Sequence, residues 1–224
     1  MISLTSVQDK NQLREYAYTL LKEGKLEGLS ILVEVFHEKN LRLFPDEIEM
    51  FFELALYDDN LPLLKYIVEQ DETVLHTKGD MALREAAYIG NLDMVKYLVE
   101  HKANIHAYKE HALRNAVSEK HLEIVKYLVE NGADIHISDG IILTYAISRG
   151  CVKLISYLLE QGINPRAEDN FPIKIAVEQQ RLDIITLLIE KGACVDTARE
   201  LFRKMKLQNP TIKSYLDSLP YSLT

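Results

Sequence analysis

The stretch HLEIVKYLVENGADIH at residues 121–136 repeats, with few changes, the stretch NLDMVKYLVEHKANIH at residues 91–106. Aligning the whole chain on these two copies gives a period of 30 residues. Three sets of residues keep the same place in successive units: Leu83, Leu113, Leu143 and Ile173; Ala86, Ala116, Ala146 and Ala176; and Tyr97, Tyr127, Tyr157 and Leu187. Such a period predicts a solenoid, because one unit cannot bury its own apolar face without neighbours.

Each unit has the pattern of two helices. Apolar residues recur at three- and four-residue spacings over 122–129, and again over the shorter segment 113–117, as on one face of a helix. Glycines stand between the two helices of a unit at Gly90 and Gly150, and after the second helix at Gly132, Gly162 and Gly192. A glycine is favoured after a helix because it adopts a left-handed conformation at little cost. The unit is predicted to be helix, turn, helix and extended loop.

These residues resemble the ankyrin repeat: GADIH follows IVKYLVEN in residues 124–136, and ALRNAV opens a helix at residues 112–117. The resemblance implies an all-α solenoid of stacked helix-turn-helix units with finger loops. The usual unit has about 33 residues and a TPLH motif. Here the missing residues fall between Gly132 and Leu143, and the motif is replaced at Met81, His111, Ile141 and Phe171. The short unit is similar to the ankyrin arrays of giant amoeba-infecting viruses.

The resemblance divides the chain into three parts. Residues 45–196 are predicted to form five ankyrin repeats. Residues 1–44 read as an N-terminal capping helical pair, since GKLEGLSILVE overlays GNLDMVKYLVE of a clear repeat. Residues 197–224 read as C-terminal capping helices. Both caps are expected because an open solenoid end exposes its core.

Composition narrows the partners and the location. A net charge of −8 disfavours nucleic acid, whose phosphates repel an acidic protein. No run of apolar residues approaches the roughly 18 needed to span a bilayer, so no membrane association is expected. The two cysteines, Cys151 and Cys194, match neither a disulfide scaffold nor a zinc motif. These features predict an intracellular, cytoplasmic protein, and we expect a monomer.

Three histidines, His76, His106 and His136, occupy one position of successive units. Equivalent side chains in neighbouring helices lie about 8 to 10 Å apart, whereas nitrogens on one zinc ion bind at about 2.0 to 2.1 Å. The spacing therefore argues against a metal site, and we expect these side chains to bond to the backbone of the adjacent finger. No motif of a nucleotide-binding or hydrolytic enzyme occurs. The sequence predicts no catalytic residues, metal or cofactor.

The resemblance implies that a partner protein lies against the concave face, made by the fingers and the ends of the first helices. At such positions, the residues that stop repeating are candidate contacts, although neutral drift would produce the same variation. The candidate protein-binding residues are Tyr57, Tyr88, Tyr108, Lys109, Glu110, Arg114, Ser118, Asp139, Ile141 and Phe171. Exposed aromatic residues are the usual anchors of protein interfaces.

Two questions stay open at this level. The basic row Arg84, Arg114 and Lys174 could bind an acidic partner segment or pair with a carboxylate of its own fingers. The protein itself could be a non-catalytic adaptor or decoy, acting in the host cytoplasm if its source is viral. The alternative is a substrate or regulatory subunit of an enzyme, for example a target of finger-loop hydroxylation at His136.

Overall fold

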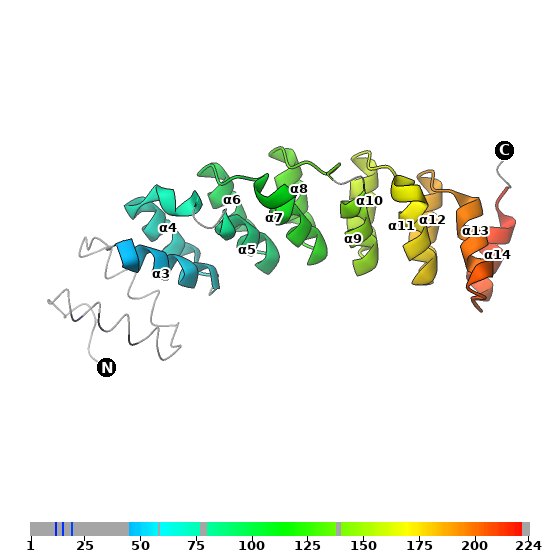
Figure 1. Ribbon diagram of the computed structural model, residues 1–224, viewed down its shortest axis with the longest axis horizontal. Helices are drawn as coiled ribbons and strands as arrows, with labels where there is room; N and C mark the ends of the chain where they lie inside the picture. Colours follow the sequence, from blue (N-terminus) through cyan, green and yellow to red (C-terminus); the bar gives the residue numbers. More distant parts are fainter. Residues whose placement is uncertain are drawn as a thin grey trace. The chain divides into compact units, whose positions relative to one another are not determined.

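The computed structural model describes residues 45–57, 59–76, 80–137 and 140–220, together with residues 12, 15 and 19. The chain divides into two compact units, Met1–Asn104 and Ile105–Thr224. Every regular element among the described residues is a helix (Figure 1), which confirms the all-α prediction. The predicted N-terminal capping pair lies outside the described residues, apart from three isolated positions.

From residue 45 onward, the described part of the first unit forms two helix pairs and a short 3-10 helix. Its elements are α3 (Pro45–Tyr57), α4 (Leu61–Gln70), η2 (Glu72–His76), α5 (Met81–Ile89) and α6 (Leu92–Glu100). Helix α3 packs on α4, and α5 packs on α6. Asn91 begins α6 by accepting a hydrogen bond from the backbone N–H of Met94 at 2.8 Å. Its side-chain amide also donates to Asp59 at 2.6 Å, so one asparagine caps a helix and joins two neighbouring turns.

The residues of the second unit that the structure describes form four helix pairs in chain order (Figure 1). Its helices are α7 (Ala107–Ser118), α8 (Leu122–Glu130), α9 (Ile141–Arg149), α10 (Val152–Glu160), α11 (Ala167–Glu178), α12 (Leu182–Glu190), α13 (Val195–Lys204) and α14 (Pro210–Ser218). The first helices of the pairs pack in series, α7 on α9, α9 on α11 and α11 on α13. Each second helix packs on the first helix of its own pair. This arrangement is the predicted helix-turn-helix stack.

The repeating residues form the core. Leu113, Leu143 and Ile173 are fully buried in the second unit, as is the alanine three residues after each of them. The alanine keeps its place because a small side chain lets neighbouring helices approach closely. Burying one leucine contributes about 1.5 to 3 kcal/mol, and the period places such a residue in every unit.

The last helix pair, α13 and α14, lies where the C-terminal cap was predicted. Helix α13 begins at Val195, two residues before the predicted boundary at 197. Asn209 begins α14 by accepting a hydrogen bond from the N–H of Ile212 at 3.2 Å, with Pro210 in the first turn. Ile212 and Leu216 are buried, so the pair has an apolar interior of its own. That this pair acts as the cap stays a prediction.

Candidate binding surface

The fingers are the loops that join the second helix of one pair to the first helix of the next. Within the first residues of α7 the backbone is not helical: Tyr108, Lys109 and Glu110 are all left-handed, with φ of 50°, 57° and 56°, and are counted here with the finger. The first residues of α11 repeat this left-handed geometry over 168–170 and are likewise counted with their finger. A left-handed conformation costs a non-glycine residue roughly 1 to 2 kcal/mol. Strain of this kind tends to be kept at functional sites, so the fingers are candidate contact regions.

A histidine and a carboxylate close the base of two fingers. His76 Nδ1 lies 3.3 Å from Asp80 Oδ1, and His106 Nδ1 lies 2.5 Å from Glu110 Oε1. Asp80 also accepts a hydrogen bond from the backbone N–H of Asn104 at 3.0 Å, which joins two successive fingers. The sequence did not predict these carboxylate partners, and the expectation that the histidines also bond to the backbone of the adjacent finger stays a prediction. Their partner is the acidic residue four positions later, and the carboxylate makes the link between fingers.

The burial of Glu110 corrects one candidate contact. Its side chain is enclosed, with the residue 3% exposed, because the left-handed turn directs it towards His106 rather than towards solvent. A partner cannot reach this carboxylate in the described structure. Glu110 is therefore a residue that holds the finger, and we remove it from the candidate surface.

The third finger lacks this pair for a reason visible in the sequence. Gly140 takes the position of the acidic residue, with φ of 97°, and a glycine has no carboxylate. His136 is exposed there, and its backbone N–H donates to Asp134 Oδ1 at 2.8 Å. The candidate contact Asp139 lies outside the described residues.

The predicted aromatic contacts are exposed in both units. Tyr57 and Tyr88, at the ends of α3 and α5, are 72% and 53% exposed. Tyr108 in the finger and Phe171 at the start of α11 are 61% and 41% exposed. Nothing in the core requires these side chains to be aromatic.

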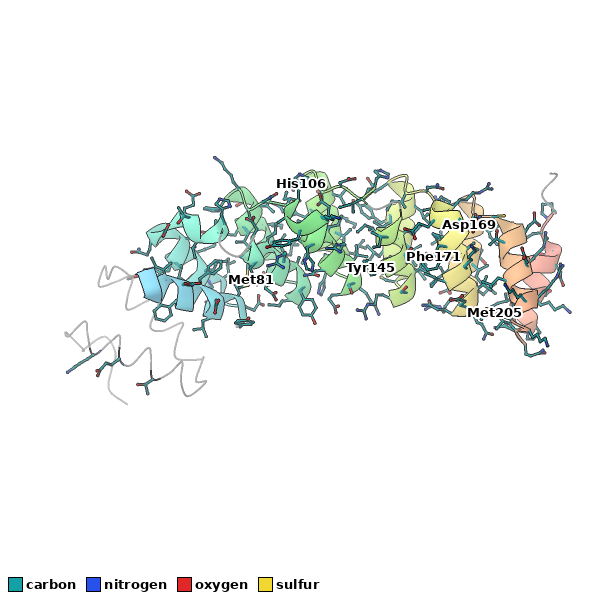
Figure 2. All side chains as sticks on the ribbon, in the orientation of Figure 1. Met81, His106, Tyr145, Asp169, Phe171 and Met205 are labelled. Carbon is teal, nitrogen blue, oxygen red and sulfur yellow. The ribbon has the colours of Figure 1, made fainter. Side chains whose placement is uncertain are left out.

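Helix α9 adds an exposed aromatic residue that the sequence reasoning missed. Tyr145 lies four residues after the half-buried Ile141, so both side chains share one face of the helix. Figure 2 shows Tyr145 and Phe171 on α9 and α11, which pack on each other. The spacing of four residues from Ile141 was the signal that would have found Tyr145.

The polar candidates have partners within the protein. Arg114 donates from Nη2 to the backbone carbonyl of Tyr108 at 3.0 Å. Ser118 accepts a hydrogen bond from Arg149 at 2.9 Å, and Lys109 is exposed. The hydrogen bond to Tyr108 holds the guanidinium of Arg114 beside this finger, where both groups can meet one partner.

The basic row is partly explained by pairing within the fingers. Lys174 binds Asp169 at 2.8 Å, and this hydrogen bond holds the pKa of the Asp169 carboxyl below its usual value. The pairing with a finger carboxylate that the sequence left open is therefore present at Lys174. Arg114 uses a backbone carbonyl instead.

The described residues also bear on the presence of metal-ligand clusters, disulfides and membrane-spanning helices. They contain no group of three or more His, Cys, Asp or Glu side chains that could hold a metal ion. Cys151 and Cys194 are both free thiols and are partly buried. None of the helices in this part of the chain combines the length and apolar character needed to cross a membrane.

Comparison with known proteins adds one finding. The family model described as ankyrin repeats (3 copies) matches residues 52–139 and 140–199, which together make up more than half of the chain. No curated protein matches the sequence.

Proposed function

Because the chain belongs to the ankyrin-repeat family, whose members typically serve as non-catalytic interaction modules, we propose that it binds a partner protein through its fingers and first helices. The exposed and half-buried residues of these segments that are named in this paragraph are called here the finger surface. From the predicted set it includes Tyr57 and Tyr88 in the first unit, and Tyr108, Lys109, Arg114, Ser118, Ile141 and Phe171 in the second. Asp139 is included on sequence grounds alone, and Tyr145 is added from its exposure.

One observation carries this proposal. Every exposed large hydrophobic residue in the described part of the chain belongs to a first helix, its end or a finger: Tyr57, Tyr88, Ile89, Tyr108, Tyr145, Phe171 and Met205. The second helices α4, α6, α8, α10, α12 and α14 carry none of them. Scattered exposed apolar residues are normal on a protein surface, but drift would place them on both helices. Their restriction to first helices and fingers in both units supports a surface that is covered in a complex.

The chemistry of the surface suits a protein partner. Tyrosine and arginine dominate the energetic centres of protein interfaces, and here Arg114 is fixed next to Tyr108 by a hydrogen bond. Ordering the guanidinium before binding lowers the entropy lost on association. We expect Tyr88, Tyr108 and Phe171 to be the anchors, with Arg114 assisting.

Two matched sets of alanine variants test the surface. Proximity labelling in cells identifies partners, and titration of a purified partner then compares the set Tyr88, Tyr108 and Phe171 with the set Lys96 and Lys126 on the second helices. Losing one anchor commonly costs at least about 2 kcal/mol, which weakens Kd roughly thirtyfold. The lysine set should leave Kd nearly unchanged. Circular dichroism confirms that both sets stay folded, and loss of binding with the lysine set alone would refute the surface.

The finer proposal is that the protein is a monomeric adaptor or decoy in the cytoplasm of a host cell. It rests on the similarity of the short repeat to viral ankyrin arrays. An adaptor joins two partners in one complex, whereas a decoy binds one partner and blocks its normal ligand. Light scattering of the purified protein tests the monomer, and competition with the partner's own ligand separates decoy from adaptor.

The alternative, a substrate for a finger-loop hydroxylase, has one observation in its favour. His136 is exposed in the finger where Gly140 replaces the acidic residue that binds His106 in the preceding finger. Incubation with an asparaginyl hydroxylase followed by peptide mass spectrometry tests it. Addition of one oxygen atom to His136 would support the alternative, and an unmodified peptide would exclude it for that enzyme.

A further inference from the structure

The last helix pair contains a pocket that the finger surface does not include. It lies between α13 and α14 and has a volume of about 330 Å³, within the size range of small binding sites. Phe202, Leu207 and Leu216 supply its apolar lining, and Arg203, Lys206 and Lys213 surround it with positive charge. Phe202 and Leu216 are buried, whereas the three basic residues are exposed. The pocket thus has an apolar floor and a basic rim.

Arg199 holds the two helices of the pocket together. Its side chain is 3% exposed and donates to the carbonyl of Leu216 at 2.8 and 3.0 Å and to the carbonyl of Leu219. It also reaches Asp196 at 3.2 Å. A cation at the carbonyl end of α14 is favourable because that end carries partial negative charge. Arg199 is therefore engaged within the protein, where it links α13 to the carbonyl end of α14.

The rim is basic although the protein as a whole is acidic. Between residues 199 and 213 the chain has five basic residues and one acidic residue, Glu200, although the whole protein carries −8. Some basic residues elsewhere in this unit, such as Lys126, Lys174 and Arg181, form ion pairs with described residues, and others such as Lys153 and Lys191 do not. Arg203, Lys206 and Lys213 form no ion pair with any described residue. Asp217 is the acidic residue of the lining.

We propose that this pocket binds an acidic peptide segment of a partner protein, which inserts an apolar side chain between α13 and α14. Carboxylates beside that side chain would meet Arg203, Lys206 and Lys213, whose charges have no partner among the described residues. An anionic membrane or a nucleic acid could reach the rim. Neither presents a side chain that fills an apolar floor made by Phe202 and Leu216. This site is distinct from the finger surface, because none of the residues that line it belongs to that set.

Fluorescence anisotropy with labelled peptides tests the proposal. The probes are the acetylated hexapeptide DELFED and the permutations of its six residues. One control peptide set replaces leucine and phenylalanine by serine, and another replaces the acids by serine. At least one acidic, apolar peptide is expected to bind with Kd below about 1 mM, and both control sets should bind at least about tenfold more weakly.

Charge-reversal variants then locate the binding. The double variant Lys206→Glu with Lys213→Glu should weaken the binding of the best peptide at least about tenfold. The matched control, Lys153→Glu with Lys191→Glu, changes two exposed lysines outside the pocket and should have no effect. Alanine at Tyr108 and Phe171 should have none either, so failure here is distinct from failure of the finger surface. Circular dichroism verifies that each variant is folded.

Three results would overturn the proposal. The first is that no permutation binds below about 1 mM. The second is binding that the control double variant weakens as much as the pocket double variant does. The third is tighter binding, dependent on Lys206 and Lys213, to phosphatidylserine vesicles or to a single-stranded oligonucleotide than to any of the peptides.

Discussion

A series of glycine substitutions tests whether the turns obey the backbone geometry of the structure. Gly132 follows α8 with φ of 100°, and its N–H bonds to the carbonyl of Val129 at 3.0 Å. Lys102 takes the same place after α6, with φ of 64° and a bond to the carbonyl of Val99, also 3.0 Å. The two turns differ in the residue that adopts the left-handed conformation, and in little else of the backbone.

The magnitude follows from what an added Cβ would meet. A Cβ at Gly132 would have nothing within 4 Å, so Gly132→Ala adds only conformational cost. The left-handed penalty of roughly 1 to 2 kcal/mol is offset by about 0.4 to 1 kcal/mol from the less flexible unfolded chain. We therefore expect a loss of about 1 kcal/mol. Lys102→Gly makes the opposite change, because it removes the Cβ from a left-handed residue, and it should stabilise the protein by about 0.5 to 1 kcal/mol.

Gly140 provides the contrasting case. A Cβ there would lie 2.4 Å from the Cβ of Ala167, at a φ of 97°. Ala167 is itself buried, so the finger backbone must shift. Overpacking of this kind costs about 1 to 3 kcal/mol, and the conformational cost adds to it. Gly140→Ala is expected to cost about 2 to 4 kcal/mol.

Urea denaturation followed by far-ultraviolet circular dichroism measures the series. The midpoint should rise for Lys102→Gly, fall slightly for Gly132→Ala and fall furthest for Gly140→Ala, with similar slopes. Equal losses at Gly132 and Gly140 would refute the close approach to Ala167. Destabilisation by Lys102→Gly would refute the left-handed assignment at that turn.

Three further predictions concern the core, metal and a thiol. Leu128→Ala removes a fully buried side chain and should cost about 2 to 5 kcal/mol in urea denaturation; an unchanged midpoint would contradict its place in the core. EDTA or stoichiometric zinc should leave the thermal midpoint unchanged, because the described residues hold no cluster of metal ligands; a rise of several degrees with zinc would contradict the finger geometry. A hydrogen bond with Thr197 lowers the pKa of the Cys194 thiol, so more of the reactive thiolate is present at a given pH. Thr197→Val removes this bond and should slow alkylation of Cys194 but not of Cys151. Peptide mass spectrometry after timed iodoacetamide treatment measures both rates, and equal slowing would refute the assignment.

The candidate surface could be predicted only in part from the sequence. Tyr57, Tyr88, Tyr108 and Phe171 were found because they depart from a repeating pattern, and all four are exposed. Glu110 departs from the pattern too, yet its departure reflects a structural role at the base of the finger. Sequence variation within the repeat shows that a position is not needed for the common core. It does not show which way the side chain points.

The helical architecture followed from the sequence alone. The spacing of apolar residues within a unit predicts its helices, and the period of 30 residues predicts that the units stack. Each unit repeats one hydrophobic pattern, and stacking is the one way to bury it. Only the tertiary structure decided which charged groups meet. Three consecutive left-handed residues direct Glu110 inwards to His106, and the packing of α13 on α14 sets three basic residues around an apolar pocket. Such contacts depend on backbone direction and on pairs of residues far apart in the chain, which a periodic pattern does not encode.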